Sequence, residues 1–152
     1  MPPLFTIGYE RAAQPDVLAA LKQARIELLV DTRAVAASRR AGFSKRLLAA
    51  GLDDIGIAYV HLQKLGTPAE GREAARGGDL KTLWRIYERH IKTPDAQMQL
   101  AELETIVRSK RRVCLLCYER NPDECHRKRI AELIHERTGQ KIEHLFASPL
   151  GI

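Results

Sequence analysis

The segment from Cys117 to Arg127 holds the densest group of chemically reactive side chains in the sequence. Cys117 and Cys125 are candidate nucleophiles, because a thiolate attacks electrophiles readily. Glu119 and His126 are side chains that can transfer protons. Arg127 carries a planar guanidinium group that matches a phosphate or a carboxylate. We therefore predict that Cys117, Cys125, Glu119 and His126 are catalytic and that Arg127 binds substrate.

The cysteines allow three interpretations. In the first, Cys117 or Cys125 is a nucleophile with His126 or Glu119 as its base. In the second, Cys117, Cys125 and His126 bind zinc, although the spacing departs from common zinc-ligand patterns and a fourth ligand is missing. In the third, the thiols pack in the core, the role that we assign to Cys114. We predict no metal ligand and no cofactor, and keep zinc as an alternative; three clustered cysteines also argue against a disulfide framework.

A second candidate segment is the basic loop that starts at Arg33. Between Arg33 and Arg46 there are five basic residues and no acid. Ser44 stands before a predicted helix, whose first amide groups favour phosphate. We predict that Asp31, Arg33, Arg39 and Ser44 bind substrate, and the alternative is a solvated loop in which Asp31 and Arg33 pair with each other.

The elements that must position these residues alternate between strands and helices. Short apolar, β-branched runs predict strands, and apolar residues at helical spacing predict the helices between them. Such alternation is typical of a Rossmann-like three-layer α/β domain, with a mostly parallel sheet and helices on both faces. The predicted strands are 4–7, 26–30, 57–62, 113–117 and 142–146, and the predicted helices are 15–25, 44–52, 80–91, 94–107 and 121–139.

In an open parallel sheet, ligands bind beyond the carboxyl ends of the strands. Tyr9 and Glu10, Asp31 and Arg33, His61, and Cys117 with Glu119 all fall at predicted strand ends. His61 is therefore added to the substrate-binding candidates. Tyr59, which lies on the same predicted strand, is a further candidate, and Arg127 and Arg39 are expected nearby. By contrast, the basic cluster 108–112 precedes the fourth strand. We expect it at the opposite edge, as a solubilising patch.

Composition places the chain among ordinary globular proteins. It has 152 residues, 45% hydrophobic and 29% charged, with a net charge of +6. We predict one domain over 1–152, with an irregular insertion at about 67–79 that could close over the site. The absence of a long apolar run predicts a cytoplasmic protein without a membrane partner. The positive charge favours anionic partners, with a nucleotide or nucleic acid among them.

Eight short motifs together resemble a known family. They are Thr6–Tyr9, Val30–Arg33, Ser38–Arg39, Gly42–Lys45, Tyr59-x-His61-Leu62, Leu65–Gly66, Leu116–Glu119 and Cys125–Arg127. In this order they are similar to the domain of unknown function 488 family, across nearly the whole chain. Two positions depart from the family's usual pattern: Glu10 stands where serine is common, and Ala36 or Ala37 stands where a proline commonly follows the Asp-x-Arg motif. The resemblance implies a compact α/β domain whose motif residues, Arg33, Arg39, Cys117, Glu119, His126 and Arg127, form one site.

Three hypotheses of function follow. The first is an anion site at the strand ends, in an enzyme that acts as a hydrolase or transferase on a phosphate-bearing substrate. The second is a non-enzymatic module that binds nucleotide or nucleic acid. The third is a metal or redox sensor centred on the cysteines.

Overall fold

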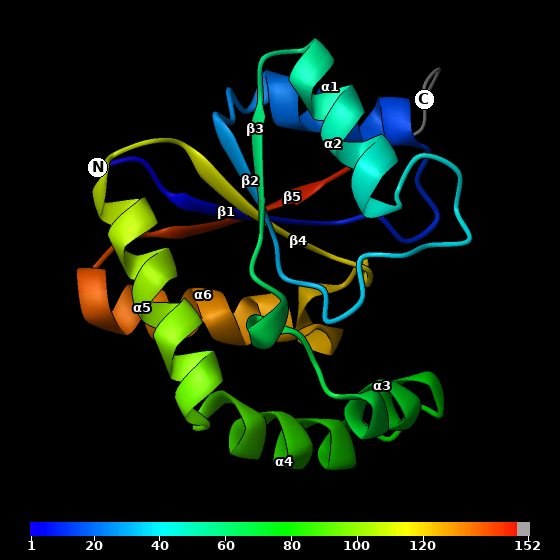
Figure 1. Ribbon diagram of the computed structural model, residues 1–152, viewed down its shortest axis with the longest axis vertical. Coiled ribbons are helices and arrows are strands. Elements are labelled where there is room, and N and C mark those ends of the chain that lie inside the picture. The colour runs from blue at the N-terminus through cyan, green and yellow to red at the C-terminus, as the bar shows by residue number, and fades with distance from the viewer. Residues whose placement is uncertain (149–152) are drawn as a thin grey trace.

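The centre of the molecule is a sheet of five parallel strands in the order β3-β2-β4-β1-β5 (Figure 1). The computed structural model describes residues 1–148. All five predicted strands are present, with small shifts of their ends, and the predicted α/β class is confirmed. The strands are β1 (Leu4–Gly8), β2 (Leu28–Asp31), β3 (Ala58–His61), β4 (Val113–Cys117) and β5 (Ile142–Phe146).

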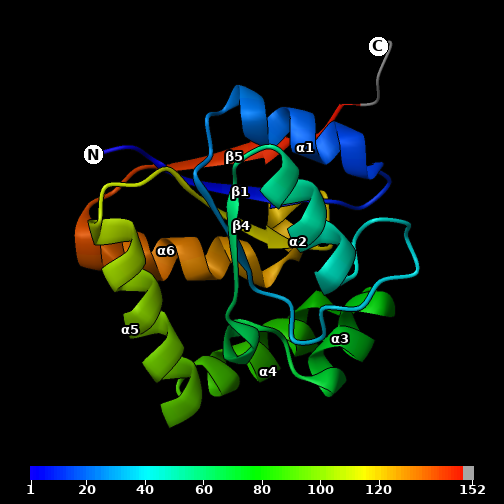
Figure 2. The ribbon, with the colours of Figure 1, turned by 45° about the horizontal axis from the view of Figure 1, so that its top comes forward.

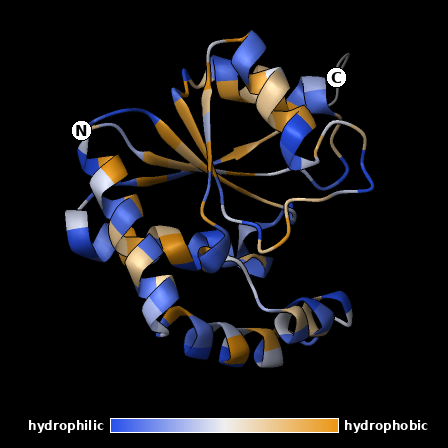
Figure 3. Cartoon of the chain, in the orientation of Figure 1, coloured by the Kyte–Doolittle hydropathy of each residue, from blue (hydrophilic) through white to orange (hydrophobic). Residues whose placement is uncertain are grey.

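Helices cover both faces of this sheet. One layer contains α1 (Gln14–Gln23) and α2 (Lys45–Asp54). The other contains α4 (Leu80–Ile91), α5 (Pro94–Arg108) and α6 (His126–Thr138) (Figures 1 and 2). Because each central strand is buried on both sides, its residues alternate between two apolar cores. The strands are accordingly mostly orange in Figure 3, whereas the helices are mixed, with much blue among their orange residues.

The strand ends carry the features that matter for a site. β4 and β1 are neighbours in the sheet, but their connections run in opposite directions: the chain passes from β1 to β2 on one side and from β4 to β5 on the other. The gap between β4 and β1 is therefore a topological switch point, the place where ligands bind in open α/β sheets. The basic cluster 108–112 lies at the amino ends of the strands, because the carbonyl of Arg112 accepts from the amides of Glu27 and Leu28, where β2 begins.

The segment 67–79 differs from the expected irregular insertion, because it contains α3 (Ala69–Arg76). This helix was not foreseen because it lacks an apolar stripe, and Gly71 is its only buried residue. In both ribbon views α3 lies at the same end of the molecule as the basic segment 33–44 (Figures 1 and 2).

The last helix begins later than predicted. Pro122–Glu124 forms a 3-10 helix, and Asn121 caps it by accepting from the amide of Asp123 at 3.0 Å. Cys125 then adopts an extended backbone conformation and serves as the N-cap of α6. In a helix that began at Asn121, as predicted, Cys125 would share the polar face with Arg129 and Glu132. That expectation is wrong, because Cys125 precedes the helix and its side chain is buried.

No helix within residues 1–148 combines the length and the apolar character that a membrane crossing requires.

Candidate functional site

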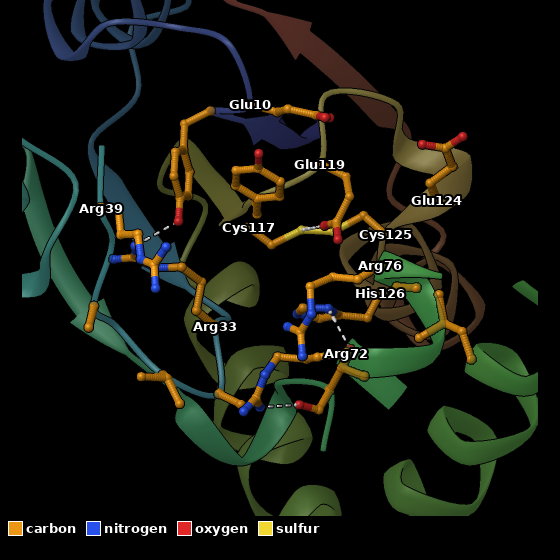
Figure 4. A pocket seen from close by; sticks show the side chains of 18 residues that line it. Glu10, Arg33, Arg39, Arg72, Arg76, Cys117, Glu119, Glu124, Cys125 and His126 are labelled. Carbon is orange, nitrogen blue, oxygen red and sulfur yellow. Dashed lines mark hydrogen bonds between the residues drawn. A yellow bond between two sulfur atoms is a disulfide. The ribbon is translucent and has the colours of Figure 1, made fainter. Parts of the chain in front are cut away.

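A pocket of about 740 Å³ lies at the carboxyl ends of the central strands (Figure 4). Its walls come from the segments after β1, β2 and β4, from α3, and from the start of α6. The polar and sulfur-bearing lining residues are Tyr9, Glu10, Arg33, Arg39, Thr67, Arg72, Arg76, Cys117, Tyr118, Glu119, Glu124, Cys125 and His126. The pocket therefore sits at the switch point that the topology creates.

Arg33 is a buried arginine that is held rigidly in the pocket wall. Its Nε and Nη2 donate to the carboxylate of Asp31 at 2.9 and 2.7 Å. Its Nη1 donates to the hydroxyl of Tyr9 and to the carbonyl of Phe43. Burial acts against the charge, but the bonds to Asp31 outweigh it and raise the pKa of Arg33. The guanidinium group is therefore a fixed cation at the pocket surface.

Tyr59 and His61 support this pair from behind. The hydroxyl of Tyr59 donates to Asp31 at 2.5 Å. Burial is the main cause that raises the pKa of Tyr59, and this hydrogen bond is the second. His61 Nε2 lies 2.7 Å from the carbonyl oxygen of Arg33. Asp31, Tyr59 and His61 thus position Arg33 and do not line the pocket.

Ser44 also lies away from the pocket. It is the N-cap residue of α2, but its hydroxyl donates to the carbonyl of Ser38 and accepts from the amide of Ser38. Its role in the structure is to close the loop that carries Arg39.

Three further arginines, Arg39, Arg72 and Arg76, line the pocket from two separate segments. Arg72 donates to the carbonyl of Thr67 at 2.9 Å. Within residues 1–148, none of the three forms an ion pair with a carboxylate. Arg72 and Arg76 were missed by the sequence analysis, although their spacing of four residues would have placed them on one face of a helix.

The sulfur atoms of Cys117 and Cys125 meet in bonding contact, drawn as a disulfide in Figure 4. This contact differs from the expectation that no disulfide framework is present. Cys117 ends β4, Cys125 caps α6, and their Cα atoms are 7.2 Å apart. A carboxylate oxygen of Glu119 lies 3.6 Å from the sulfur of Cys117. Burial raises the pKa of Glu119.

His126 is buried between two threonines. Its Nε2 lies 2.8 Å from the carbonyl oxygen of Thr32, and its Nδ1 lies 2.9 Å from the hydroxyl of Thr67. Burial lowers the pKa of His126 to about 4. The imidazole is therefore neutral at pH 7, with the Nε2 proton donated to Thr32.

Arg127 is fully buried and lies behind the pocket wall. It donates to the hydroxyl of Thr6 and to the carbonyls of Glu119 and Arg120. Its Nη1 also lies 3.5 Å from the sulfur of Cys117. Burial lowers the pKa of Arg127 to about 10. Arg127 thus holds the loop after β4 in place.

The predicted site residues fall into two groups. Arg33, Arg39, Cys117, Glu119, Cys125 and His126 line one pocket, whereas Asp31, Ser44, Tyr59, His61 and Arg127 lie outside its lining. Cys114 is buried in the sheet with no part in the lining, consistent with a core role.

A search of curated proteins and a search of solved structures each found no match. The family model described as "Domain of unknown function DUF488" matches residues 14–134. This span contains the basic loop, α3 and the whole segment from Cys117 to Arg127. The chain therefore belongs to the DUF488 family.

Proposed function

We propose that this protein binds a phosphate-bearing ligand, a nucleotide or a short stretch of nucleic acid, in the pocket and acts on it as an enzyme. The observation that carries this proposal is the convergence of Arg39, Arg72 and Arg76 on one pocket without a carboxylate partner in residues 1–148. Guanidinium groups that are not neutralised within the protein favour an anion between them.

Phosphate fits this arrangement better than a single carboxylate. The three arginines come from two segments, so an anion with several oxygens in different directions can contact both walls at once. Arg33 adds a fourth guanidinium group to the lining, which Asp31 holds in place while offsetting its charge. In addition, α6 begins at the pocket with Cys125 and His126, and a helix N-terminus favours a negative charge.

The opposite rim supplies groups for a reaction. In Figure 4, Glu10, Glu119 and Glu124 lie on one side of the pocket and the labelled arginines on the others, with the two cysteines between them. Glu119 is the acid–base candidate, because its carboxylate is half-buried beside Cys117. Such a division would let the arginines hold the phosphate while Glu119 moves a proton at the adjoining part of the substrate.

Ligand-induced thermal stabilisation tests the binding part of this proposal, because a ligand that binds only the folded state raises the melting temperature. The probes are inorganic phosphate, a nucleoside monophosphate and a short single-stranded oligonucleotide. We expect stabilisation of the wild type, and a loss of about tenfold or more in affinity in the double variant R72A/R76A, because each charge-assisted bond contributes roughly 1.5–3 kcal/mol.

Arg111→Ala is the matched control, since Arg111 is an exposed arginine at the other edge of the sheet. It should bind as the wild type does. Absence of stabilisation by every probe, or an equal loss in the Arg111 variant, would contradict the proposal.

Product analysis tests the enzymatic part. The stabilising ligand is incubated with wild type and with Glu119→Gln, and the mixture is analysed by mass spectrometry. Turnover in the wild type alone supports the acid–base role of Glu119. Saturable binding with no product in either protein would contradict the enzymatic part and show a non-enzymatic binding module.

A further inference from the structure

We propose that Cys117, Cys125 and His126 form a binding site for one zinc-class divalent ion, with a fourth coordination position open to the pocket. One potential ligand atom from each residue lies within 4.8 Å of the other two, and all three residues line the pocket. Three protein ligands and one open position are the pattern of a catalytic zinc site. This inference does not depend on the proposed phosphate ligand.

The spacing of the cysteine backbones favours a shared ion over a covalent bond. The Cα atoms are 7.2 Å apart, whereas a disulfide usually joins Cα atoms about 4.4–6.8 Å apart. Two thiolates on one zinc ion, each about 2.3 Å from it in tetrahedral geometry, have sulfurs about 3.8 Å apart. Sulfurs that share an ion are farther apart than sulfurs joined by a covalent bond, and this greater distance fits Cα atoms that are 7.2 Å apart.

Arg127 provides an independent argument for a thiolate at Cys117. This guanidinium group is fully buried and makes no ion pair within residues 1–148. Three of its hydrogen-bond partners are neutral oxygens, and the fourth is the sulfur of Cys117 at 3.5 Å. Because an unpaired buried charge is costly, the arginine favours a negative sulfur over a disulfide or a neutral thiol.

The hydrogen bonds of His126 prepare it as a ligand. Its Nε2 must carry the proton, because its partner, the carbonyl of Thr32, can only accept. A backbone carbonyl is the usual outer partner of a metal-ligating histidine. Nδ1 therefore keeps its lone pair, and an ion there would replace the hydroxyl of Thr67, which now contacts it at 2.9 Å.

In the reduced protein, the two thiols release two protons and form two sulfur–zinc bonds, and His126 donates a lone pair without losing a proton. Where the cysteines are joined, a thiol or phosphine reductant first supplies two electrons to the sulfur–sulfur bond, and two protons complete the thiols. The two thiolates then neutralise the ion, and a water molecule completes the tetrahedron on the pocket side.

Metal analysis of the full chain tests the site. The protein is purified under a phosphine reductant without chelator, incubated with zinc, desalted and analysed by elemental mass spectrometry. We expect about one zinc per chain in the wild type and in Cys114→Ser, since Cys114 lies outside the cluster. In Cys117→Ser and Cys125→Ser the occupancy should fall by about tenfold or more, because even a change in an outer partner costs 10–100-fold in affinity.

Cys125→Ser keeps the test valid if the other variant misfolds, because serine is a favoured N-cap residue and α6 should start normally. Cobalt substitution gives a second readout, the thiolate-to-cobalt absorption in the near ultraviolet, which both cysteine variants should weaken. A metal-free wild type under these conditions would overturn the site. A Cys117–Cys125 disulfide that survives the reductant, or an equal zinc loss in Cys114→Ser, would do so too.

Discussion

Arg33 and Arg127 are two buried arginines that the protein stabilises in different ways. Arg33 has a full carboxylate partner in Asp31, whereas Arg127 relies on neutral oxygens and the sulfur of Cys117. Arg33 faces the pocket and Arg127 does not. Arg33 therefore presents its guanidinium group to the pocket, whereas Arg127 uses the same group to anchor the loop after β4.

Arg33→Ala should lower the free energy of unfolding by about 3–5 kcal/mol, because it leaves the buried carboxylate of Asp31 without its cation. Arg72→Ala removes a partly exposed arginine without an ion pair, and it should change stability by no more than about 0.5 kcal/mol. Urea denaturation of both variants measures the difference. Equal stabilities would show that the Asp31–Arg33 pair does not hold the pocket wall.

Tyr59 should make stability fall at alkaline pH. Its folded pKa is raised above the ordinary value of about 10 by burial and by its bond to Asp31. The stabilisation is therefore complete below about pH 10 and is lost as the pH rises above it, because the unfolded tyrosine ionises first. Urea midpoints at pH 8 and pH 11 should differ more in the wild type than in Tyr59→Phe; equal differences would contradict this assignment.

At the level of elements, two glycines set how closely the site segments approach. A Cβ on Gly8, at the end of β1, would lie 1.8 Å from the carbonyl oxygen of Glu119. A Cβ on Gly66 would lie 2.1 Å from the backbone nitrogen of Ala34. The loop after β4 can therefore pack against the end of β1 only because Gly8 has no side chain. In the same way, the segment after Arg33 can pack against the segment before Thr67 only because residue 66 is glycine.

Gly8→Ala should displace the loop that holds Glu119, and should lower the unfolding free energy by roughly 1–3 kcal/mol or more, as overpacking does. Gly77→Ala is the control, because its Cβ would meet neighbours at an ordinary 3.7 Å. Thermal unfolding and the ligand-induced shift should both be impaired in the first variant alone. A Gly8 variant that behaves as the control does would exclude tight packing at this point.

How far the sequence predicts this architecture depends on the segment. The buried strands are evident because Val113–Cys117 and its neighbours are continuous apolar runs between loops. α3 could not be predicted from apolar periodicity, because only Gly71 faces the core. The start of α6 shifted because Asn121-Pro forms a separate 3-10 turn, which moved Cys125 from an exposed face to a buried cap.

The same two errors explain what was missed in the candidate site. The residues at the strand ends, Arg33, Cys117 and Glu119, follow from the parallel topology, and they do line the pocket. Arg72 and Arg76 come from α3 and enter the pocket only through tertiary packing. The contact between Cys117 and Cys125 depends on the extended backbone of Cys125, which no local pattern indicated.

At the scale of the whole molecule, the parallel sheet separates two basic regions. The pocket arginines lie beyond the carboxyl ends of the strands, and the cluster 108–112 lies at their amino ends. Because all five strands run in one direction, a ligand at one edge is remote from the other. A change in an arginine signal on ligand binding can therefore be attributed either to the pocket or to the cluster 108–112.

An NMR titration of the arginine side-chain Nε–H groups with a nucleoside monophosphate would locate the phosphate-binding site residue by residue. We expect the signals of Arg39, Arg72 and Arg76 to shift and saturate together, while those of Arg108, Arg111 and Arg112 stay in place. Shifts confined to the cluster 108–112, or no shift at any arginine, would contradict a phosphate-binding pocket at the carboxyl edge of the sheet.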